Sequence, residues 1–296
     1  MTRKTTVSDT DSDLPAGLYI IATPIGNIED ITLRALRILG KADLIACEDT
    51  RVSGKLTSYY DISAPKMPYH DHNAEAARPK LLALLREGRR IALISDAGMP
   101  LVSDPGYKLV AACAAENIPV TCVPGASASL AAVVLSGLPT DKFMFVGFLP
   151  VKQAARRAAL AEIKNVPATL VFYETGPRLE KSLQDMLEVL GDRQAAVARE
   201  LTKKFEEVNR DNLSNLLKYY AGGGETRGEI VVVVGAPETD GGERWTEADI
   251  DALLLEMVGK QGMSVKDAAA YVSAKSGLKK RDVYQRALLL NKKGDR

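Results

Sequence analysis

Side chains that can accept a proton or bind an anion follow several short apolar runs of this sequence. The three groups are Glu48, Asp49 and Arg51; His70, His72 and Asn73; and Arg199, Glu200 and Lys203. A carboxylate or a neutral imidazole can remove a proton from an attacking hydroxyl group. A guanidinium group binds phosphate through two parallel hydrogen bonds. We therefore predict catalytic roles for Glu48, Arg51, His72, Arg199 and Glu200, with the two arginines contacting phosphates.

Each group also has a purely structural alternative. Glu48 and Arg51 can pair with one another across a turn. His70 and His72 lie two positions apart, so both face one side if the segment is extended. They are the only histidines of the chain. A metal site there would need a third ligand, which the neighbouring sequence does not offer, so we predict no bound metal. The lysine at 203 can belong to a solvated charged face.

Loops rich in glycine, proline and serine follow other apolar runs. They cover residues 23–27, 95–106, 124–129 and 174–178. Ligands of open α/β sheets bind at the carboxyl ends of strands, and glycine lets the backbone approach a ligand closely. Asp96 or Asp104 can accept hydrogen bonds from a ribose or an ammonium group. The alternative is that these loops are ordinary turns.

Apolar runs alternate with helical patterns over most of the chain, which indicates a parallel or mixed sheet. The predicted strands are 18–22, 43–47, 91–95, 120–123, 143–148, 168–173, 195–198 and 229–234. The predicted helices are 31–39, closed by Gly40, then 81–87, 107–117 and 179–190. A Ser-, Thr- and Asp-rich start lacks the apolar stretch of a signal peptide and reads as a disordered tail.

The predicted elements divide the chain into four parts. They are a tail at 1–14, an α/β domain at 15–125, a second α/β domain at 126–238, and a helical domain at 244–296. The two α/β domains meet near 124–138, and a linker at 237–242 precedes the helical domain. Its expected helices are 247–258, 264–275 and 279–290, with Ser264 as an N-cap.

Composition and missing motifs exclude several classes of protein. Hydrophobic residues make up 46% and charged residues 26%, an ordinary globular balance. No apolar run approaches the roughly 20 residues that span a bilayer. The three cysteines show no Cys-x-x-Cys spacing, which favours reduced thiols in a cytoplasmic protein. Dinucleotide, P-loop, zinc and serine-hydrolase motifs are absent from the sequence.

The basic charge gathers at the end of the chain. Residues 275–296 contain eight basic and two acidic residues, whereas the whole chain has a net charge of +1. Two helices around Ser276-Gly277 resemble a helix-turn-helix, from which Lys279, Lys280, Arg281 and Arg286 are expected to project. This pattern favours contact with the backbone of a structured RNA. The alternative is a helical cap with a charged surface.

Several long stretches resemble the ribosomal RNA small subunit methyltransferase I branch of the tetrapyrrole-methylase superfamily. They are Thr-Pro-Ile-Gly-Asn-Ile-Glu-Asp-Ile-Thr-Leu-Arg-Ala-Leu (23–36), Cys-Glu-Asp-Thr-Arg (47–51), Tyr-His-Asp-His-Asn (69–73), Ser-Asp-Ala-Gly-Met-Pro-Leu-Val-Ser-Asp-Pro-Gly-Tyr (95–107), Pro-Gly-Ala-Ser-Ala (124–128), Phe-Tyr-Glu-Thr-Gly-Pro-Arg (172–178) and Arg-Glu-Leu-Thr-Lys (199–203). The resemblance covers about residues 17–237 and the helical end.

This resemblance implies a two-domain tetrapyrrole-methylase fold, the class III S-adenosylmethionine methyltransferase fold, with a small all-helical C-terminal domain. It implies an S-adenosylmethionine site between the α/β domains, 2′-O-methylation of a cytidine in the decoding region of 16S rRNA, and a homodimer without membrane attachment. The residues expected to bind the cofactor are Pro24, Gly26, Asp96, Ala97, Gly98, Met99, Ser127, Ala128, Tyr173, Glu174, Glu229 and Ile230. Lys203 and the four basic residues at 279–286 named above are expected to bind RNA.

Four questions stay open at this point. The tetrapyrrole enzymes carry a shorter Gly-Asp-Pro loop, so either Asp96 or Asp104 can face the cofactor. The proton acceptor is not identified, and either free rRNA or the assembled small subunit can be the substrate. A corrinoid or tetrapyrrole-precursor methylase of the same fold is an alternative function, and a non-catalytic rRNA-binding assembly factor is another.

Overall fold

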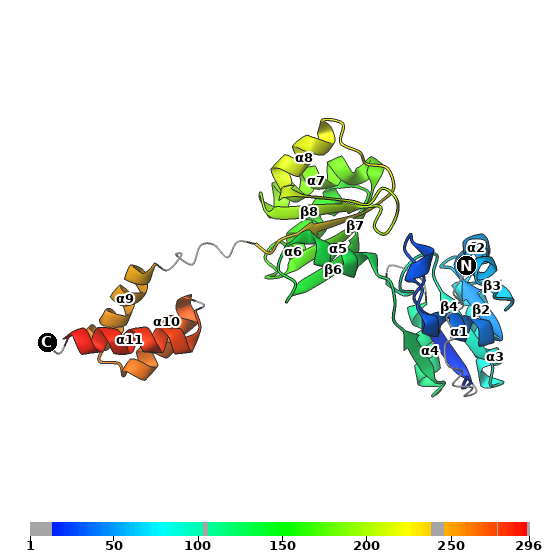
Figure 1. The fold of residues 1–296 in the computed structure, drawn as a ribbon, viewed down its shortest axis with the longest axis horizontal. Coiled ribbons are helices and arrows are strands. Elements are labelled where there is room, and N and C mark those ends of the chain that lie inside the picture. The colour runs from blue at the N-terminus through cyan, green and yellow to red at the C-terminus, as the bar shows by residue number, and fades with distance from the viewer. Residues whose placement is uncertain (1–13, 103–105, 238–245, 277, 295–296) are drawn as a thin grey trace, which may run out of the picture. The chain divides into compact units, whose positions relative to one another are not determined.

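The computed structural model describes residues 14–102, 106–237, 246–276 and 278–294 (Figure 1). The chain divides into two compact units, and the boundary between them falls between Ala236 and Pro237. The expected tail lies outside the described residues except for Leu14, which packs against a core of the first unit. Most of the expected linker and Asp104 also lie outside them.

The first unit contains two lobes, each built on a sheet. The elements of the first lobe are β1 (Gly17–Ile21), the 3₁₀ helix η1 (Ile28–Asp30), α1 (Leu33–Lys41), β2 (Leu44–Cys47), α2 (Thr50–Tyr59), β3 (Lys66–Pro68), α3 (Ala74–Arg86), β4 (Arg90–Ile94), α4 (Tyr107–Ala115) and β5 (Val120–Val123). The strands pair in the order β3-β2-β4-β1-β5, and every pairing is parallel.

Helices cover both faces of this first sheet, as its apolar strands require. All five residues of β1 are buried, and they alternate between two cores. Residues of α1 and α2 pack on one face, and residues of α3 and α4 pack on the other. Because all five strands are parallel, their carboxyl ends lie along one edge of the sheet. The loops that carry the candidate site residues therefore share that edge.

The second lobe contains a mixed sheet. Its elements are α5 (Ala128–Ser136), β6 (Phe143–Phe148), α6 (Gln153–Ile163), β7 (Thr169–Thr175), α7 (Gly176–Leu190), β8 (Gln194–Arg199), β9 (Glu207–Asn212), α8 (Leu213–Ala221) and β10 (Glu229–Val234). The strand order is β6-β7-β10-β8-β9. Only β6 and β7 are parallel; the other pairs are antiparallel. Helices α6, α7 and α8 cover one face, and α5 covers the other.

The antiparallel pairs bring three chain segments to one end of the second sheet. Ile230 at the start of β10 pairs with Glu174 on one side and with Arg199 on the other. The parallel neighbour β6 places Phe148 beside Tyr173. The end of β7, the start of β10 and the end of β8 therefore lie together, although they are far apart in the sequence.

The second unit is a bundle of α9 (Glu247–Leu255), a π-helical turn (Glu256–Lys260), α10 (Val265–Ser276) and α11 (Lys280–Gly294). Thr246 and Asp249 form a capping box at the start of α9, and the side chain of Ser264 accepts the backbone N–H of Asp267, as its predicted capping role requires. Apolar residues of all three helices and of the π-helical turn form the core.

Arg286 does not project freely from this bundle, so that expectation was wrong. Its guanidinium binds Asp251 with Nε 2.5 Å and Nη2 2.9 Å from the carboxylate, and Nη1 lies 2.9 Å from Glu247. Hydrogen bonds from these carboxylates raise the pKa of Arg286. The two acceptors belong to α9, so Arg286 fastens α11 to α9.

The predicted elements differ from the structure in several places. Gly40 lies inside α1, which ends at Lys41, so Gly40 does not close the helix. Helix α3 starts seven residues before the predicted position, with Pro79 inside it. The short strand β3 and the polar strand β9 escaped prediction because neither carries an apolar alternation. Helix α5 fills the segment that was predicted to be only a boundary.

No described helix is long and apolar enough to cross a membrane.

A buried ion pair fastens α6 to α7 and leads to a prediction about stability. Asp185 is fully buried; it accepts Arg156 Nε and Arg157 Nε at 2.6 Å each, and Gln153 Nε2 at 3.1 Å. We expect Asp185→Asn to lower the free energy of unfolding by about 3–5 kcal/mol, because the buried Arg156 loses its counter-charge. Urea unfolding measures the change.

The matched control is Glu188→Gln. This carboxylate also binds Arg157, but both side chains of that pair are 40% exposed, so the loss should stay below about 1 kcal/mol. Equal effects of the two substitutions would contradict the assignment of Asp185 as the buried anchor.

Candidate functional site

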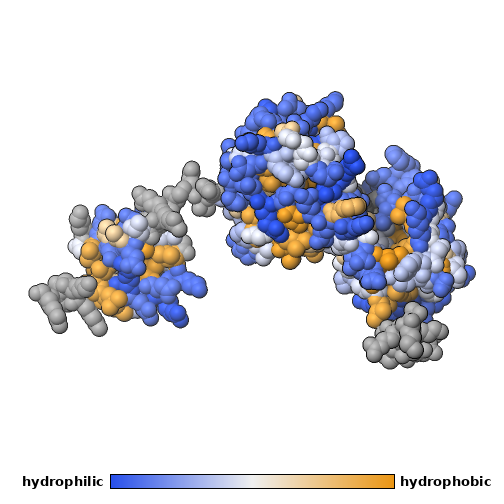
Figure 2. All heavy atoms as spheres, turned by 45° about the horizontal axis from the view of Figure 1, so that its top comes forward, coloured by the Kyte–Doolittle hydropathy of each residue, from blue (hydrophilic) through white to orange (hydrophobic). Residues whose placement is uncertain are grey.

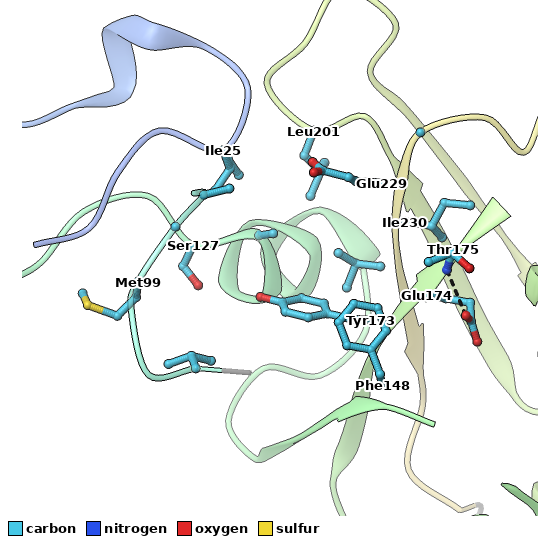
Figure 3. A pocket seen from close by; sticks show the side chains of 16 residues that line it. Ile25, Met99, Ser127, Phe148, Tyr173, Glu174, Thr175, Leu201, Glu229 and Ile230 are labelled. Carbon is cyan, nitrogen blue, oxygen red and sulfur yellow. Dashed lines mark hydrogen bonds between the residues drawn. The ribbon is translucent and has the colours of Figure 1, made fainter. Parts of the chain in front are cut away.

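A pocket of about 260 Å³ lies between the two lobes of the first unit (Figure 3). We call it the main pocket. Its lining residues are Ile25, Ala97, Gly98, Met99, Val102, Ser127, Ala128, Phe148, Tyr173, Glu174, Thr175, Leu201, Gly228, Glu229, Ile230 and Val231. The lining residues from Ile25 to Ala128 belong to the loops after β1, β4 and β5 of the first sheet or directly follow them. The lining residues from Phe148 to Val231 belong to the second lobe.

Backbone pairing holds the first wall of the main pocket. The N–H of Thr23 donates to the carbonyl of Gly98 at 2.9 Å, and the N–H of Gly98 donates back at 3.1 Å. The hydroxyl of Thr23 donates to the carbonyl of Ser95 at 3.1 Å. Gly98 has a φ of +79°, a conformation that costs little only without a side chain. The loops after β1 and β4 are thereby joined to each other.

Aromatic and aliphatic side chains form much of the second wall. The ring of Tyr173 makes edge contacts with Phe145 and Phe148, at centroid distances of 4.9 and 5.5 Å. Figure 3 shows Tyr173 pointing from β7 toward Ser127 and Met99, which lie on the loops after β5 and β4. Flat apolar walls of this kind suit a ring system, while the backbone at Ala97–Met99 and Gly228–Ile230 offers polar groups.

Glu174 lines the main pocket, but its carboxylate is already bound by protein groups. It accepts the N–H of Thr175 at 2.9 Å and the hydroxyl of Ser182, and Arg178 Nε lies 3.2 Å away. The side chain is 1% exposed. These contacts fix the junction between β7 and α7, so the carboxylate shapes the pocket wall.

A second, more open depression lies at the ends of β2, β3 and β4. We call it the acidic hollow; it is lined by Glu48, Asp49, Thr50, Arg51, Pro68, His70, His72 and Asp96. Burial raises the pKa of Glu48, and the carboxylates of Asp96 and Asp71 raise it further. Burial also raises the pKa of Asp96, although its Oδ1 accepts the N–H of Asp49 at 3.1 Å. The hollow thus holds two carboxylates whose charged forms are disfavoured.

Arg51 does not pair with Glu48, as one alternative expected. It pairs with Asp49, with Nη2 2.6 Å from Oδ2, and this bonding lowers the pKa of Asp49 to about 2. The guanidinium remains 88% exposed. Glu48 is therefore left without a cationic neighbour on α2, which agrees with its raised pKa.

The two histidines lie close together, but not in an extended segment. Residues 71–73 form a turn, in which the side chain of Asn73 accepts the N–H of His70 at 2.9 Å. The imidazole centroids are 6.0 Å apart, and both side chains line the acidic hollow. Among the described residues, no group of three or more His, Cys, Asp or Glu side chains is arranged to hold a metal ion.

A third depression joins the other two. We call it the connecting hollow; it is lined by Thr23, Pro24, Ile25, Gly26, Ile28, Val52, Ser53, Lys55, Leu56, Ile94, Ser95, Asp96, Ala97, Lys203 and Glu229. It shares Asp96 with the acidic hollow and Ile25, Ala97 and Glu229 with the main pocket. A ligand in the main pocket can therefore face a second ligand that lies over the acidic hollow.

Arg199, Glu200 and Lys203 are engaged with protein partners. Arg199 is 9% exposed and binds Glu207 at 3.0 Å and the carbonyl of Arg227 at 3.1 Å. Lys203 Nζ lies 2.9 Å from both Glu200 and Glu229. The Lys203 hydrogen bond lowers the pKa of Glu200. These contacts favour structural roles over phosphate binding or proton acceptance.

The structure gathers most of the predicted cofactor residues, though not all of them. Ala97, Gly98, Met99, Ser127, Ala128, Tyr173, Glu174, Glu229 and Ile230 line the main pocket. Pro24 and Gly26 line the connecting hollow instead. Asp96 lies in the acidic and connecting hollows, one residue before the main pocket wall.

Three pocket residues lie outside the loops and residues predicted to bind a ligand: Phe148, Leu201 and Val231. Ile25, Val102 and Thr175 belong to the predicted loops at 23–27, 95–106 and 174–178. Phe148 was part of a predicted strand, but only the pairing of β6 with β7 places it beside Tyr173. Leu201 follows β8. In the segment after this strand, the sequence predicted catalytic residues and no residue of the cofactor pocket. Gly228 directly precedes the predicted residues Glu229 and Ile230 at the start of β10, and its φ of +97° exploits the freedom of glycine.

Comparison with known families agrees with this architecture. The family of Tetrapyrrole (Corrin/Porphyrin) Methylases matches residues 17–217, and the RsmI C-terminal HTH domain matches residues 246–291. Two α/β lobes with a pocket between them, followed by a helical unit, thus define a tetrapyrrole methylase, as the resemblance implied.

Curated relatives narrow the family further. The chain is 50% identical over 278 residues to ribosomal RNA small subunit methyltransferase I of Mesorhizobium japonicum, covering 94% of this chain and 93% of that one. It is 44% identical to the enzyme of the same name from Halalkalibacterium halodurans, covering 95% and 98% of the two chains. The chain therefore belongs to the ribosomal RNA small subunit methyltransferase I family. This membership does not favour the two alternative functions, a corrinoid or tetrapyrrole-precursor methylase and a non-catalytic assembly factor.

Solved structures share the fold at low sequence identity. Uroporphyrin-III-C-methyltransferase from Thermus thermophilus matches with a TM-score of 0.54 and 23% identity, over 74% of this chain and 94% of that one. Diphthine synthase matches with a TM-score of 0.58 and 15% identity, over 74% and 89% of the two chains. These similarities concern the fold only.

Gly26 shows how closely the two lobes interlock. A Cβ atom at this position would lie 2.4 Å from Lys203 Cγ, 2.8 Å from Thr202 Oγ1 and 2.9 Å from the Leu201 carbonyl oxygen. We expect Gly26→Ala to destabilise the first unit by about 1–3 kcal/mol, as overpacking does. Chemical unfolding measures this change.

Gly40→Ala is the matched control. A Cβ at Gly40 meets nothing within 4 Å, and the residue lies inside α1. The change should stabilise the protein by about 0.5–1 kcal/mol. A neutral Gly26→Ala variant would show that the lobes do not interlock at this residue.

Proposed function

We propose that this protein transfers a methyl group from S-adenosylmethionine to the ribose 2′-oxygen of a cytidine in the decoding region of 16S rRNA. The observation that carries the proposal is the connecting hollow, which shares lining residues with both the main pocket and the acidic hollow, in a chain related along 94% of its length to ribosomal RNA small subunit methyltransferase I. A donor site and an acceptor site of different polarity thus adjoin. An rRNA substrate also places the protein in the cytoplasm.

The chemistry of the main pocket fits the methyl donor. Its apolar and aromatic walls suit an adenine ring, and the backbone at Ala97–Met99 and Gly228–Ile230 can bind the polar groups. The ring of Tyr173 can stabilise a sulfonium cation. When bound, S-adenosylmethionine supplies an electrophilic methyl group. The protein has to hold this group in line with the acceptor oxygen, which can contribute roughly 7–11 kcal/mol.

Glu48 is the proton acceptor that the electrostatics support best. A ribose hydroxyl is a weak nucleophile, and a general base within reach accelerates its attack by about 10²–10⁴-fold. Glu48 has no cationic neighbour on α2 and a raised pKa, whereas Lys203 holds Glu200 and Arg51 holds Asp49. His72 lines the same hollow and completes its polar wall. No metal ion is required for this chemistry.

We also propose a division of labour among the parts of the chain. Residues 15–125 and 126–238 form the two α/β domains that hold the donor and the target ribose. Residues 244–296 dock on the rRNA backbone. Lys279, Lys280 and Arg281 are exposed at the start of α11 and suit phosphate contacts. The salt bridges of Arg286 assign it to the stability of this domain.

An exposed apolar surface on the second lobe supports a homodimer. Leu130 and Val134 lie one turn apart on α5 and are 51% and 75% exposed, and the edge strand β6 exposes Phe143 and Met144. Figure 2 shows hydrophobic residues interrupting the hydrophilic surface of this lobe. Large exposed apolar side chains on one lobe favour an interface. Sedimentation of the wild type and of Val134→Glu tests this assembly.

The decisive test of the proposed function is methylation of defined RNA. Purified full-length protein, labelled S-adenosylmethionine and either free 16S rRNA or small subunits from cells that lack the protein should give one 2′-O-methylated cytidine, located by mass mapping. The two substrates separate free rRNA from the assembled subunit. Absence of the modification with both substrates, or no loss of it in the deletion strain, would overturn the proposal.

The main pocket and the acidic hollow should respond differently to substitution. We expect Tyr173→Ala to weaken the binding of S-adenosylhomocysteine at least tenfold, because the residue forms the aromatic wall. Asp96→Asn should change this affinity little, because Asp96 lies outside the main pocket. Calorimetry measures both. A large loss of affinity in Asp96→Asn would return this aspartate to the donor site.

Substitution of Glu48 should separate stability from activity. The pKa of Glu48 is higher in the folded protein than in the unfolded chain, so the ionised side chain destabilises the fold. The free energy of unfolding therefore decreases as the pH rises from the unfolded pKa through the folded pKa. We therefore expect Glu48→Gln to unfold at a higher temperature at neutral pH. Methyl transfer should fall by about 10²–10⁴-fold, since the amide cannot take the proton.

The pH profile gives a second measure of the same group. In the wild type, kcat/KM should fall on the acid side with a midpoint above the usual glutamate pKa of about 4.3. Glu200→Gln is the control, because its carboxylate is already bound by Lys203. A Glu48→Gln variant that keeps wild-type turnover would exclude Glu48 as the base.

A further inference from the structure

The loop between β8 and β9 presents an exposed aromatic ring with a cation above it. Phe205 is 65% exposed, and Lys204 Nζ lies 5.5 Å from the centroid of its ring. Lys203, one residue earlier, lines the connecting hollow. The exposed ring of Phe205 is therefore available for a base to stack on it.

This loop is held in a defined conformation. Glu200 and Thr202 have φ angles of +51° and +66°, which is an outlier for the β-branched Thr202. The hydroxyl of Thr202 accepts the N–H of Asn27 at 2.9 Å, and its own N–H donates to Glu206 at 2.6 Å. Strained conformations that the surroundings enforce in this way cluster at binding sites. Phe205 therefore stands on a preorganised support.

Helix α2 presents a second exposed aromatic residue, Tyr59, on the same face as two cations. Arg51, Lys55 and Tyr59 are spaced four residues apart, so they share one face of the helix, and all three are exposed. Tyr59 is 61% exposed and packs edge-on against Tyr60, whose hydroxyl donates to the Ile28 carbonyl at 2.8 Å. Lys55 lines the connecting hollow, as Lys203 does.

Charge differs between the hollows and these two exposed groups. The acidic hollow contains Glu48, Asp49 and Asp96, and the connecting hollow shares Asp96 and adds Glu229. Asp49 is paired with Arg51 and Glu229 with Lys203, so Glu48 and Asp96 are the carboxylates that repel phosphate there. They can bind a ribose hydroxyl. The exposed cations of Lys55 and Lys204 can bind phosphate. A strand lying over the connecting hollow would thus keep its phosphates at the exposed lysines and turn a ribose toward the carboxylates.

We infer that the Lys204–Phe205 and Lys55–Tyr59 pairs form a binding track for single-stranded RNA, in which nucleotides flanking the target stack on Phe205 and Tyr59. This inference rests on the proposed function and adds that the RNA is bound as a single strand. Unpaired bases can stack on aromatic side chains, whereas the bases of an A-form duplex expose no faces. The target nucleotide must therefore lie in an unpaired segment.

The test measures the binding of a labelled single-stranded fragment of small-subunit rRNA by the full chain, with a duplex of the same sequence as the second probe. We expect Phe205→Ala and Tyr59→Ala each to weaken single-strand binding roughly 5- to 150-fold, the range of a lost stacked base. Phe205→Tyr and Tyr59→Phe should keep wild-type affinity. The matched control is Tyr219→Ala, an exposed aromatic residue of α8 that lines none of the three depressions.

The lysines have a separate readout. Lys204→Ala and Lys55→Ala should each reduce the dependence of log affinity on log salt concentration by about one unit. Calorimetry with S-adenosylhomocysteine should give wild-type affinity for all of these variants, which shows that they are folded. Loss of single-strand binding with unchanged donor binding supports the track.

Failure of this inference can be distinguished from failure of the proposed function. If the wild type methylates 16S rRNA while the Phe205→Ala and Tyr59→Ala variants bind the single strand and turn over as the wild type does, the track is wrong and the function stands. Preference of the wild type for the duplex would also overturn the track. If the wild type methylates no 16S rRNA, the proposed function fails, and the track fails with it.

Discussion

The parallel pairing of the five strands in the first lobe is the constraint on which the rest depends. Parallel strands carry all their carboxyl ends to one edge, whatever their order in the chain. The order β3-β2-β4-β1-β5 then arranges the loops along that edge. The loops after β3, β2 and β4 line the acidic hollow, and those after β4, β1 and β5 line the main pocket. The loop after β4 serves both, so it lies where donor and acceptor must meet.

The second lobe completes this edge by a different pairing. Its antiparallel strands bring Tyr173, Ile230 and Leu201 to one end of the sheet, and Ile25 of the first lobe packs into the core beneath α5. The loop after β1 also contacts the β8–β9 loop, through the bond from Asn27 to Thr202. The lobes therefore hold the main pocket between contacts that tolerate little change in volume, and the pocket is preorganised for its ligand.

Electrostatics assigns different tasks to carboxylates that look alike in the sequence. Asp185 and Glu200 are neutralised by arginine or lysine and stabilise the fold. Glu48 is not neutralised, and burial beside Asp96 makes its charge costly. A carboxylate with a raised pKa is better suited to take up a proton than one locked in a salt bridge, because proton affinity is what a base must supply. The arrangement agrees with a reaction in which methyl transfer and proton removal occur on adjacent surfaces.

The sequence by itself determined the α/β class, the helical end, the strand-end loops and most of the residues of the main pocket. It could do so because apolar periodicity and glycine-rich turns are local properties, and the long motifs carried the family resemblance. Only the tertiary structure decided which partner each charge takes: Arg51 binds Asp49, Arg286 binds α9, and Asp96 lies outside the main pocket. It also decided that Phe148, Leu201 and Val231 belong to the pocket. Such choices depend on strand order and lobe contacts between residues far apart in the chain, which no local pattern encodes.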